Sequence, residues 1–256
     1  MLKIFFLVLA KDEENVEQKV EELNGLGVPF LIVCGQKLDL PNLIYRAPNG
    51  KYDAINFGFG LIPYDTDVVV LNDVDTRIRN FEAATRLFES QSVDLVFSKV
   101  SVSGPQNLFY GFLDSVREWI LVAASGELML LRYDLLRRIV PLRPCKAEDT
   151  YILFKALELK SHCVFCQDCS VETERTKTAE KEELYKRKTV SGIYQALAYS
   201  DPPYYIKGFY ALLPFLCSLL LLSGKSGYFW TKGIIAGFTD YLRGDRSGTW
   251  KTTYMD

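Results

Sequence analysis

Histidine is almost absent from this chain, and so is any excess of charge. His162 is the only histidine among 256 residues, and 30 Lys and Arg against 32 Asp and Glu leave a formal net charge of −2. A protein that binds nucleic acid presents a strongly basic surface to the phosphates, so this balance argues against that class. We expect His162 to lie at the edge of a strand and not to serve as a catalytic base.

Cysteine is also scarce, and its spacing does not complete a zinc site. Cys163, Cys166 and Cys169 form a Cys-x-x-Cys-x-x-Cys pattern, but His162 is too close to Cys163 to supply the fourth ligand. Two interpretations stay open. The three residues are either small apolar side chains on a buried strand or partners in a disulfide, as in proteins of organisms that live in hot environments.

No apolar run reaches the length of about 20 residues that crosses a bilayer as a helix. Residues 208–223 are uncharged but contain Pro214, and a second apolar stretch, residues 227–238, follows a Gly-Lys-Ser-Gly turn. We expect residues 201–256 to form a hydrophobic helical hairpin that dips into one leaflet or lies in the interface, next to a catalytic domain at residues 1–200. The alternative is that both stretches simply pack on that domain.

Two further features bear on where the protein works. From Tyr204 onward the chain has six basic and three acidic residues, a charge of +3, whereas the remainder carries −5. A segment that is both basic and apolar suits an anionic membrane surface. Residues 4–10 are apolar, but Lys11 and three acidic residues follow them instead of a small-residue cleavage site. We therefore expect a buried strand there, no export signal, and a membrane-associated protein at the cytoplasmic face.

The first half of the chain alternates between strand and helix patterns. Apolar runs predict strands at residues 4–10, 30–35, 67–73 and 93–100, and helical spacing predicts helices at residues 12–27, 50–62 and 79–90. This alternation indicates a mainly parallel sheet with helices on both faces. Such sheets bind ligands beyond the carboxyl ends of their strands. Asp73 and Asp75 stand at one such end, and Asp12 and Glu13 stand at another.

The second half is less regular. We expect a helix at residues 108–126, a strand running into a helix at residues 127–139, a helix at residues 148–160 that opens on two acids, a strand at residues 162–174 and a helix at residues 179–200. There is no internal repeat and no low-complexity tract.

Asp73-Val74-Asp75 resembles the Asp-x-Asp motif of GT-A glycosyltransferases, specifically family 2. The resemblance is specific because further motifs of the family occur in the family's order over residues 1–195, about three-quarters of the chain. The resemblance implies an α/β fold of the GT-A type, Rossmann-like, with a mainly parallel sheet flanked by helices. The other matching segments are residues 10–16 with Asp12 and Glu13, residues 50–56 with Gly50, Lys51, Ala54 and Asn56, residues 125–136 with Gly126 and Arg132, the pair Glu148-Asp149, and residues 168–174.

The resemblance implies a nucleotide-sugar donor site with a divalent metal. Asp73 and Asp75 would hold Mn²⁺ or Mg²⁺, with Asp75 coordinating directly and Asp73 nearer the ribose. A hard cation takes oxygen ligands and neutralises the charge that builds on the diphosphate leaving group. The remaining donor-binding residues would be Asp12 and Glu13 at the base and ribose, together with Lys51 and Asn56.

On the acceptor side, the resemblance makes Asp149 the general base. It would take the proton from an acceptor hydroxyl as that oxygen attacks the anomeric carbon, and a single displacement would invert the sugar's stereochemistry. Glu148 would orient this base or begin the helix. The residues expected to bind the diphosphate or an acceptor phosphate are Arg132, Arg187 and Lys188.

Two departures from the family pattern bear on the substrate. The second strand ends in Cys34, Gly35 and Gln36 where the family has acids that hold the base. Residues 185–189 stand where processive synthases have Gln-x-x-Arg-Trp, but they lack the Gln and the Trp. We therefore expect the transfer of one sugar and no polymer.

These expectations combine into a membrane-associated, metal-dependent, inverting hexosyltransferase. It would move one hexose from GDP-mannose, or else from UDP-glucose or a UDP-N-acetylhexosamine, to a hydroxyl of a lipid-linked acceptor. The alternatives are a polyprenyl-phosphate sugar synthase that uses a UDP- or GDP-sugar and a non-catalytic, membrane-anchored protein that binds nucleotide sugars.

Overall fold

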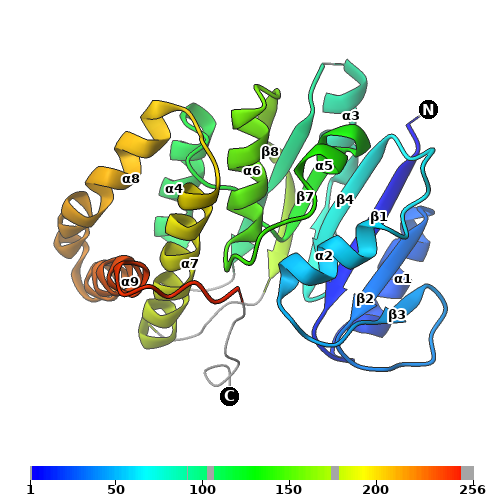
Figure 1. The fold of residues 1–256 in the computed structure, drawn as a ribbon, viewed down its shortest axis with the longest axis horizontal. Coiled ribbons are helices and arrows are strands. Elements are labelled where there is room, and N and C mark those ends of the chain that lie inside the picture. The colour runs from blue at the N-terminus through cyan, green and yellow to red at the C-terminus, as the bar shows by residue number, and fades with distance from the viewer. Residues whose placement is uncertain (1, 91, 103–106, 174–178, 249–256) are drawn as a thin grey trace.

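The computed structural model describes residues 2–90, 92–102, 107–173 and 179–248, which build a central sheet with helices on both faces (Figure 1). In this part of the chain the strands are β1 (Ile4–Ala10), β2 (Phe30–Cys34), β3 (Leu43–Tyr45), β4 (Val68–Asp73), β5 (Thr76–Arg79), β6 (Leu95–Val102), β7 (Leu128–Arg132) and β8 (Cys163–Thr173). Their order across the sheet is β3-β2-β1-β4-β7-β6-β8-β5. β1 to β4 are mutually parallel, and β7 runs antiparallel to both β4 and β6.

Alternate side chains of each inner strand enter two separate apolar layers. On β1, Leu7 and Leu9 belong to one layer and Phe6 and Val8 to the other, and all four are buried. This is the period of two that a strand imposes. Strands buried on both faces become continuous apolar runs, which is why residues 68–71 are all aliphatic.

Helices cover both layers. α2 (Lys51–Phe59), α5 (Tyr133–Ile139) and α6 (Glu148–Glu158) pack on the layer that contains Leu7 and Leu9. α1 (Val16–Leu26) and α3 (Phe81–Ser90) pack on the layer that contains Phe6 and Val8. The fold class expected from the sequence, a mainly parallel sheet flanked by helices, is confirmed.

The remaining helices form one end of the molecule, on the left in Figure 1. They are α4 (Asn107–Trp119), α7 (Ala179–Tyr199), α8 (Tyr204–Leu216), the 3₁₀ helix η1 (Cys217–Ser223) and α9 (Gly224–Leu242). α9 lies closely along α7, because a Cβ added at Gly233 would stand only 2.6 Å from the carbonyl oxygen of Glu183. Residues 204–242 meet the length and composition of a membrane-spanning helix, although η1 interrupts them.

After α9 the chain turns back toward the sheet. The ammonium of Lys146 pairs with Asp245, and Gln195 Nε2 donates hydrogen bonds to the carbonyl oxygens of Asp245 at 3.1 Å and Ser247 at 3.2 Å. Gly248 lies so close to Tyr52 that a Cβ there would be 2.7 Å from the ring. The segment that follows the hairpin therefore contacts α2 and the loop before α6.

The structure also shows elements that the sequence did not predict. α1 begins at Val16, four residues later than expected, because Asn15 takes the left-handed conformation with φ of 63°. The short strands β3 and β5 were not expected, and α4 ends at Trp119 although helix was predicted to residue 126. The six cysteines are free and buried, which matches the first of the two interpretations for β8. His162 lies one residue before β8, as expected.

Candidate functional site

The carboxyl ends of three neighbouring parallel strands meet at one edge of the sheet. Ala10 at the end of β1 pairs with Cys34 at the end of β2, and Leu9 pairs with Asp73 at the end of β4. The loops that follow these strands therefore emerge side by side. This is where open α/β sheets bind ligands, and the expected donor residues come from these loops.

The loops after β1 and β2 touch each other. A Cβ on Gly35 would lie 2.3 Å from the carbonyl oxygen of Lys11, so only glycine fits at this point. Beside it, Gln36 Nε2 donates a hydrogen bond to Glu13 Oε2 at 3.2 Å. Asp12 Oδ1 accepts a hydrogen bond of 3.1 Å from the backbone two residues further on. Gln36, which replaces an acid expected at the end of β2, thus contacts a residue expected to bind the donor.

A cavity of about 420 Å³ opens beside Glu13. Its other side is formed by Leu38, Asp39 and Leu40, and the start of α1 closes it. Asp39 provides a carboxylate next to this cavity, three positions past Gln36. The sequence did not suggest it, because an irregular loop and not the strand end carries the acid.

The turn that carries Asp73 and Asp75 is held by the hydroxyl of Thr76. Thr76 Oγ1 donates to the carbonyl oxygen of Asp73 at 2.8 Å and accepts from Asn72 Nδ2 at 2.9 Å. Asn72 Nδ2 also donates to the carbonyl oxygen of Glu127 at 2.6 Å, which joins this turn to the segment before β7. The turn is therefore fixed without using the two carboxylates, and Asp75 is exposed.

A buried lysine supports the same turn from behind. Lys19 on α1 is 2% exposed, and its ammonium donates to the carbonyl oxygen of Thr76 and, at 2.6 Å, to Glu22. Burial lowers the pKa of Lys19, and the Glu22 carboxylate opposes that change. Lys19 was not predicted as a site residue, although its position between Val16 and Leu23 on the apolar face of α1 indicates that it is buried.

Lys51 joins the turn after β4 to the start of α6. Its ammonium lies 2.5 Å from Asp73 Oδ2 and 3.9 Å from Glu148 Oε1. Burial alone would lower the pKa of Lys51, but the carboxylates of Asp73 and Glu148 outweigh it and raise that pKa above its ordinary value. Lys51 therefore stays charged, and it holds the end of β4 against the start of α6.

Glu148 and Asp149 are the first two residues of α6, and Glu148 is the one that lies 3.9 Å from the Lys51 ammonium. Burial raises the pKa of Glu148 to about 8, although Lys51 opposes the change. Burial also raises the pKa of Asp149, against the Thr150 N–H that donates to its Oδ1 at 2.6 Å. A Cβ on Gly126 would lie 3.2 Å from Asp149 Oδ2, so glycine leaves the space in front of that carboxylate open. A raised pKa suits a group that accepts a proton near neutral pH.

The raised pKa of Glu148 predicts how stability depends on pH. Its pKa rises from an ordinary 4.5 to about 8 on folding, so the folded state holds this proton more tightly than the unfolded chain does. The resulting stabilisation is complete below about pH 4.5 and is lost as the pH rises to about 8. We expect the free energy of unfolding of the wild type to fall over this range relative to Glu148→Gln, measured by urea denaturation. Each unit of pKa difference contributes about 1.4 kcal/mol.

Glu158→Gln, at the other end of α6, is a matched control of opposite sign. Burial would raise the pKa of Glu158, but hydrogen bonds from Lys155 and from the Asp201 backbone outweigh it and lower that pKa. The wild type should therefore gain stability relative to Glu158→Gln as the pH rises through about 4.5. A difference between wild type and Glu148→Gln that does not change with pH would contradict the assignment.

The two carboxylates of the β4 turn fit a divalent cation bound together with a nucleotide. Among the residues described here, no group of three or more His, Cys, Asp or Glu side chains could hold a metal by itself. Mg²⁺ and similar hard ions are commonly held by one or two carboxylates plus substrate phosphates. Asp75 is exposed, and Lys51 engages one oxygen of Asp73, which leaves the other oxygen for a ligand. The donor set is therefore complete only when phosphate oxygens join it.

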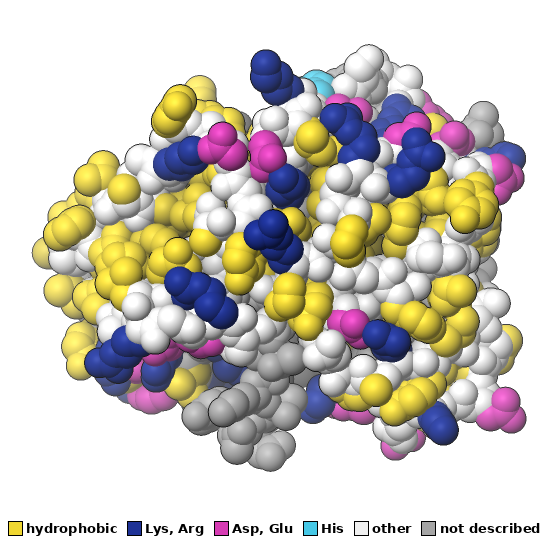
Figure 2. All heavy atoms as spheres, in the orientation of Figure 1, with side chains coloured by type: hydrophobic (Ala, Val, Ile, Leu, Met, Phe, Trp, Pro, Cys, Tyr) yellow, Lys and Arg dark blue, Asp and Glu magenta, His cyan; other side chains and the backbone are white. Residues whose placement is uncertain are grey.

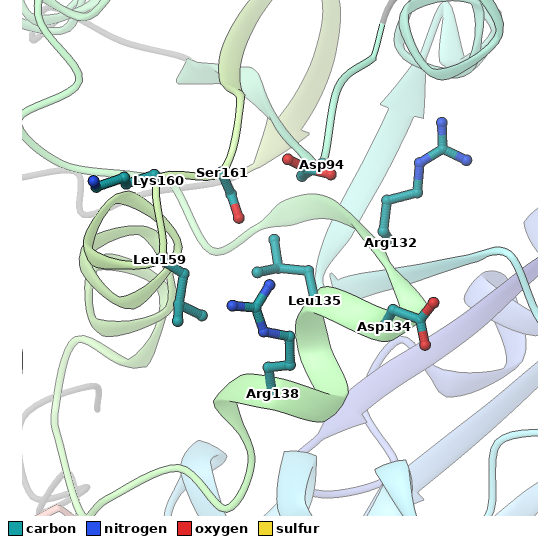
Figure 3. Close-up of a pocket in the computed structure, with 8 residues that line it drawn as sticks. All are labelled: Asp94, Arg132, Asp134, Leu135, Arg138, Leu159, Lys160 and Ser161. Atoms are coloured by element: carbon teal, nitrogen blue, oxygen red, sulfur yellow. The ribbon is translucent and has the colours of Figure 1, made fainter.

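Arg132, which was expected to bind phosphate or acceptor, lies at the opposite edge of the sheet from Asp73. β7 runs antiparallel to β4, so Arg132 at its end pairs with Val68, the first residue of β4, and not with Asp73. Its guanidinium donates to the carbonyl oxygens of Val93 at 3.2 Å and Phe88 at 2.9 Å. Figure 3 shows it at the margin of a separate cavity of about 370 Å³.

Two more expected residues, Asn56 and Arg187, have structural partners, and a third, Lys188, lies near another lysine. Asn56 holds the loop before α6, since its amide donates to the Leu142 carbonyl at 3.0 Å and accepts from the Leu142 N–H at 2.6 Å. Arg187 on α7 makes two hydrogen bonds, of 2.6 and 2.8 Å, to Asp240 on α9. Burial lowers the pKa of Lys188, and nearby Lys146 lowers it further. Of the three, Lys188 is the one that lies near the start of α6, because Lys146 precedes Glu148 by two residues.

Comparison with known proteins gives likenesses of fold. The mannosyltransferase PcManGT from Pyrobaculum calidifontis, in complex with GDP-Man and Mn²⁺, superimposes with a TM-score of 0.68 and 15% identity, covering 93% of this chain and 86% of that one. GalNAc-T7 with UDP, GalNAc and Mn²⁺ gives a TM-score of 0.54 and 10% identity, covering 95% of this chain and 56% of that one. No family model matches the chain, and no curated protein matches it. The chain has the GT-A-like α/β fold that these glycosyltransferases share.

Proposed function

We propose that this protein is an inverting, metal-dependent glycosyltransferase of family 2, which moves a single hexose from a nucleotide sugar to a hydroxyl of a lipid-linked acceptor. One observation supports this above the others. Lys51 brings Asp73, from the turn after β4, and Glu148, from the start of α6, to the same edge of the sheet. That edge lies beside the turn that carries Asp75, so a donor diphosphate and an acceptor base would be neighbours.

On the donor side, the residues of the β1 and β2 loops bind the nucleotide. The base enters the cavity beside Glu13, and Asp12 contacts the ribose. Asp75 and Asp73 would hold Mn²⁺ or Mg²⁺, which would supply positive charge to stabilise the diphosphate leaving group. Lys51, which remains protonated beside Asp73, supplies a second positive charge close to the same phosphates.

On the acceptor side, Asp149 accepts the proton of the attacking hydroxyl. Its carboxylate lies in front of Gly126, where the absence of a side chain leaves room for an acceptor, and its raised pKa favours proton uptake. Glu148 positions Lys51 and begins α6. The hydroxyl attacks the anomeric carbon from the side opposite the diphosphate, so the configuration of the sugar is inverted.

The donor base that suits this cavity best is guanine. Glu13 and Asp39 both line the cavity, and ionised carboxylates only accept hydrogen bonds. Guanine offers adjacent N–H donors that one carboxylate can accept together, whereas uracil offers a single N–H between two carbonyl groups. GDP-mannose is therefore our first choice of donor, and PcManGT, which shares the fold, is a mannosyltransferase in complex with GDP-Man.

The proposed acceptor is lipid-linked because of the C-terminal hairpin. The stretch Tyr204–Leu242 has the length and composition of a membrane helix, and an enzyme held at a membrane meets substrates held there too. The proposed location is the cytoplasmic face, with residues 1–200 as the catalytic domain and residues 201–256 as the membrane-associated part.

A panel of nucleotide sugars tests this function by thermal unfolding with Mn²⁺ and with EDTA. We expect GDP-mannose to raise the melting temperature in Mn²⁺ more than UDP-glucose or UDP-N-acetylglucosamine does at equal concentration, because a ligand that binds the folded state more tightly stabilises it more. EDTA should remove most of the rise. If no nucleotide sugar stabilises the protein, the proposal fails. If one binds but no sugar is released or transferred in Mn²⁺, the protein is a nucleotide-sugar-binding protein and not an enzyme.

A further inference from the structure

The tip of the C-terminal hairpin projects from the protein almost without burial. From Ala211 to Ser223, a stretch that the structure describes in full, Cys217 is the only buried residue. Large apolar side chains are exposed there, including Phe215 at 75% and Leu222 at 88%. Figure 2 shows hydrophobic side chains gathered on the left, where Figure 1 places α8 and the turn into α9. Water is a poor solvent for such a surface, so it marks a contact site.

Exposed aromatic side chains and lysines lie outside this tip. Tyr204 at the start of α8 is 88% exposed, and Trp119 at the end of α4 is 86% exposed. The uncharged stretch of the hairpin is bounded by Lys207 on one side and Lys225 on the other. Apolar side chains in the middle, with aromatic and basic ones at the margin, follow the order of a bilayer from acyl chains to headgroups. The excess of positive charge in this part of the chain suits anionic headgroups.

The hairpin cannot cross the bilayer while it keeps this fold. α9 is held against α7 where Gly233 approaches the Glu183 carbonyl, and Arg187 binds Asp240 across the same two helices. α8 has 13 residues, which is about 20 Å of helix and shorter than the hydrocarbon core. The chain then reverses through η1 and Gly224, whose φ is 73°.

We infer that residues 211–223 insert into one leaflet of a phospholipid bilayer with anionic headgroups, while α9 stays on the catalytic body at the membrane surface. The occupant of the exposed apolar face is therefore lipid. Lipid is favoured over a second copy of the chain or a protein partner because no charged residue stands between Lys207 and Lys225 to pair with a polar surface.

This insertion also orients the proposed active site, and that part rests on the proposed function. Tyr210 on α8 donates a hydrogen bond of 2.7 Å to the carbonyl oxygen of Val122, in the segment that leads to Gly126. Tyr210 is also close enough to Asp149 and Arg117 to interact with them electrostatically. The embedded helix and the acceptor side of the site thus form one layer, which would deliver a membrane lipid's headgroup to Asp149.

Vesicle flotation of the full-length protein tests the insertion. We expect the wild type to float with vesicles that contain phosphatidylglycerol and phosphatidylcholine, and less with phosphatidylcholine alone. The triple variant Phe215→Ser, Leu219→Ser, Leu222→Ser should lose about tenfold or more in vesicle affinity, because it removes most of the inserted apolar area. The control triple variant Leu26→Ser, Leu61→Ser, Tyr64→Ser changes side chains that are 40%, 45% and 90% exposed elsewhere, and it should float like the wild type.

Two further measurements complete the test. Brominated lipids should quench part of the tryptophan fluorescence, and the Trp119→Phe variant should lack that part. Alkaline carbonate should extract the protein from the vesicles. Equal flotation of the wild type and the Phe215 triple variant would overturn the inference, as would resistance to carbonate, which indicates a spanning helix. If the wild type does not bind vesicles and is oligomeric, and the Phe215 triple variant is monomeric, the exposed face binds a second copy of the chain. Flotation needs no donor, so failure of the proposed catalysis would leave this result intact.

Discussion

Asp149→Asn should reduce the rate constant of glycosyl transfer by about 10²–10⁴-fold, the usual contribution of a general base. The amide of Asn cannot take the proton that the acceptor hydroxyl must release. The substitution keeps the size of the side chain, and Gly126 leaves room for it as it does for Asp149. Donor affinity should stay within about twofold of the wild type, because the base acts in the transition state and not on the bound donor.

The measurement is single-turnover transfer from GDP-mannose to a lipid-linked mannoside, with donor affinity taken from thermal unfolding. Glu158→Gln, on the same helix but away from the site, should keep the wild-type rate. Glu148→Gln should fall between the two, since Glu148 contacts Lys51 at 3.9 Å and positions it. If Asp149→Asn transfers sugar at the wild-type rate, Asp149 is not the base.

The arrangement of the strand ends near Asp12, Glu13 and Asp73 was largely predictable from the sequence. Strands that are buried on both faces must be apolar throughout, so residues 4–10 and 68–73 were recognisable as neighbours in a parallel sheet. Polar residues that directly follow such strands must then come to one edge. This is why Asp12, Glu13 and Asp73 could be placed together before the structure was known.

The positions of Gly126 and Arg132 were less predictable, because they depend on strand direction. Arg132 follows Gly126 by six positions, and the motif alone suggested that both face the site. Whether a strand returns parallel or antiparallel is decided by the connection and not by its own residues. β7 runs antiparallel to β4, so the start of the strand lies near Asn72 and its end carries Arg132 to the far edge.

Contacts between distant segments could not be predicted either. The sequence predicted Lys51 only as a donor-binding residue of a motif, and nothing in the sequence places it between Asp73 and Glu148. Lys19 is a polar residue on an otherwise apolar helix face, and its partner is the backbone of Thr76, which has no sequence signature. The packing of α9 on α7 explains the glycines of α9 only once the two helices are seen together.

Asp75→Asn should abolish the dependence of donor binding and transfer on Mn²⁺. Asp75 is the exposed carboxylate of the β4 turn, whereas Asp73 is partly neutralised by Lys51 at 2.5 Å. An amide binds a hard cation much more weakly than a carboxylate, so the ion should no longer be held with the donor. Since a metal contributes several kcal/mol to stabilising charge on the leaving group, transfer should fall by about 10²–10⁴-fold.

The structure also explains why this substitution should leave the fold intact. The turn is held by Thr76 Oγ1, Asn72 and the Lys19 ammonium, and these contacts use the backbone and not the Asp75 carboxylate. Removing a negative charge beside Asp73 also relieves repulsion between the two, so the melting temperature without ligand should stay equal or rise slightly. Asp134→Asn, an exposed carboxylate on α5, is the control and should retain the response to Mn²⁺. A variant at Asp75 that still binds GDP-mannose more tightly in Mn²⁺ than in EDTA would place the ion elsewhere and separate the metal from this turn.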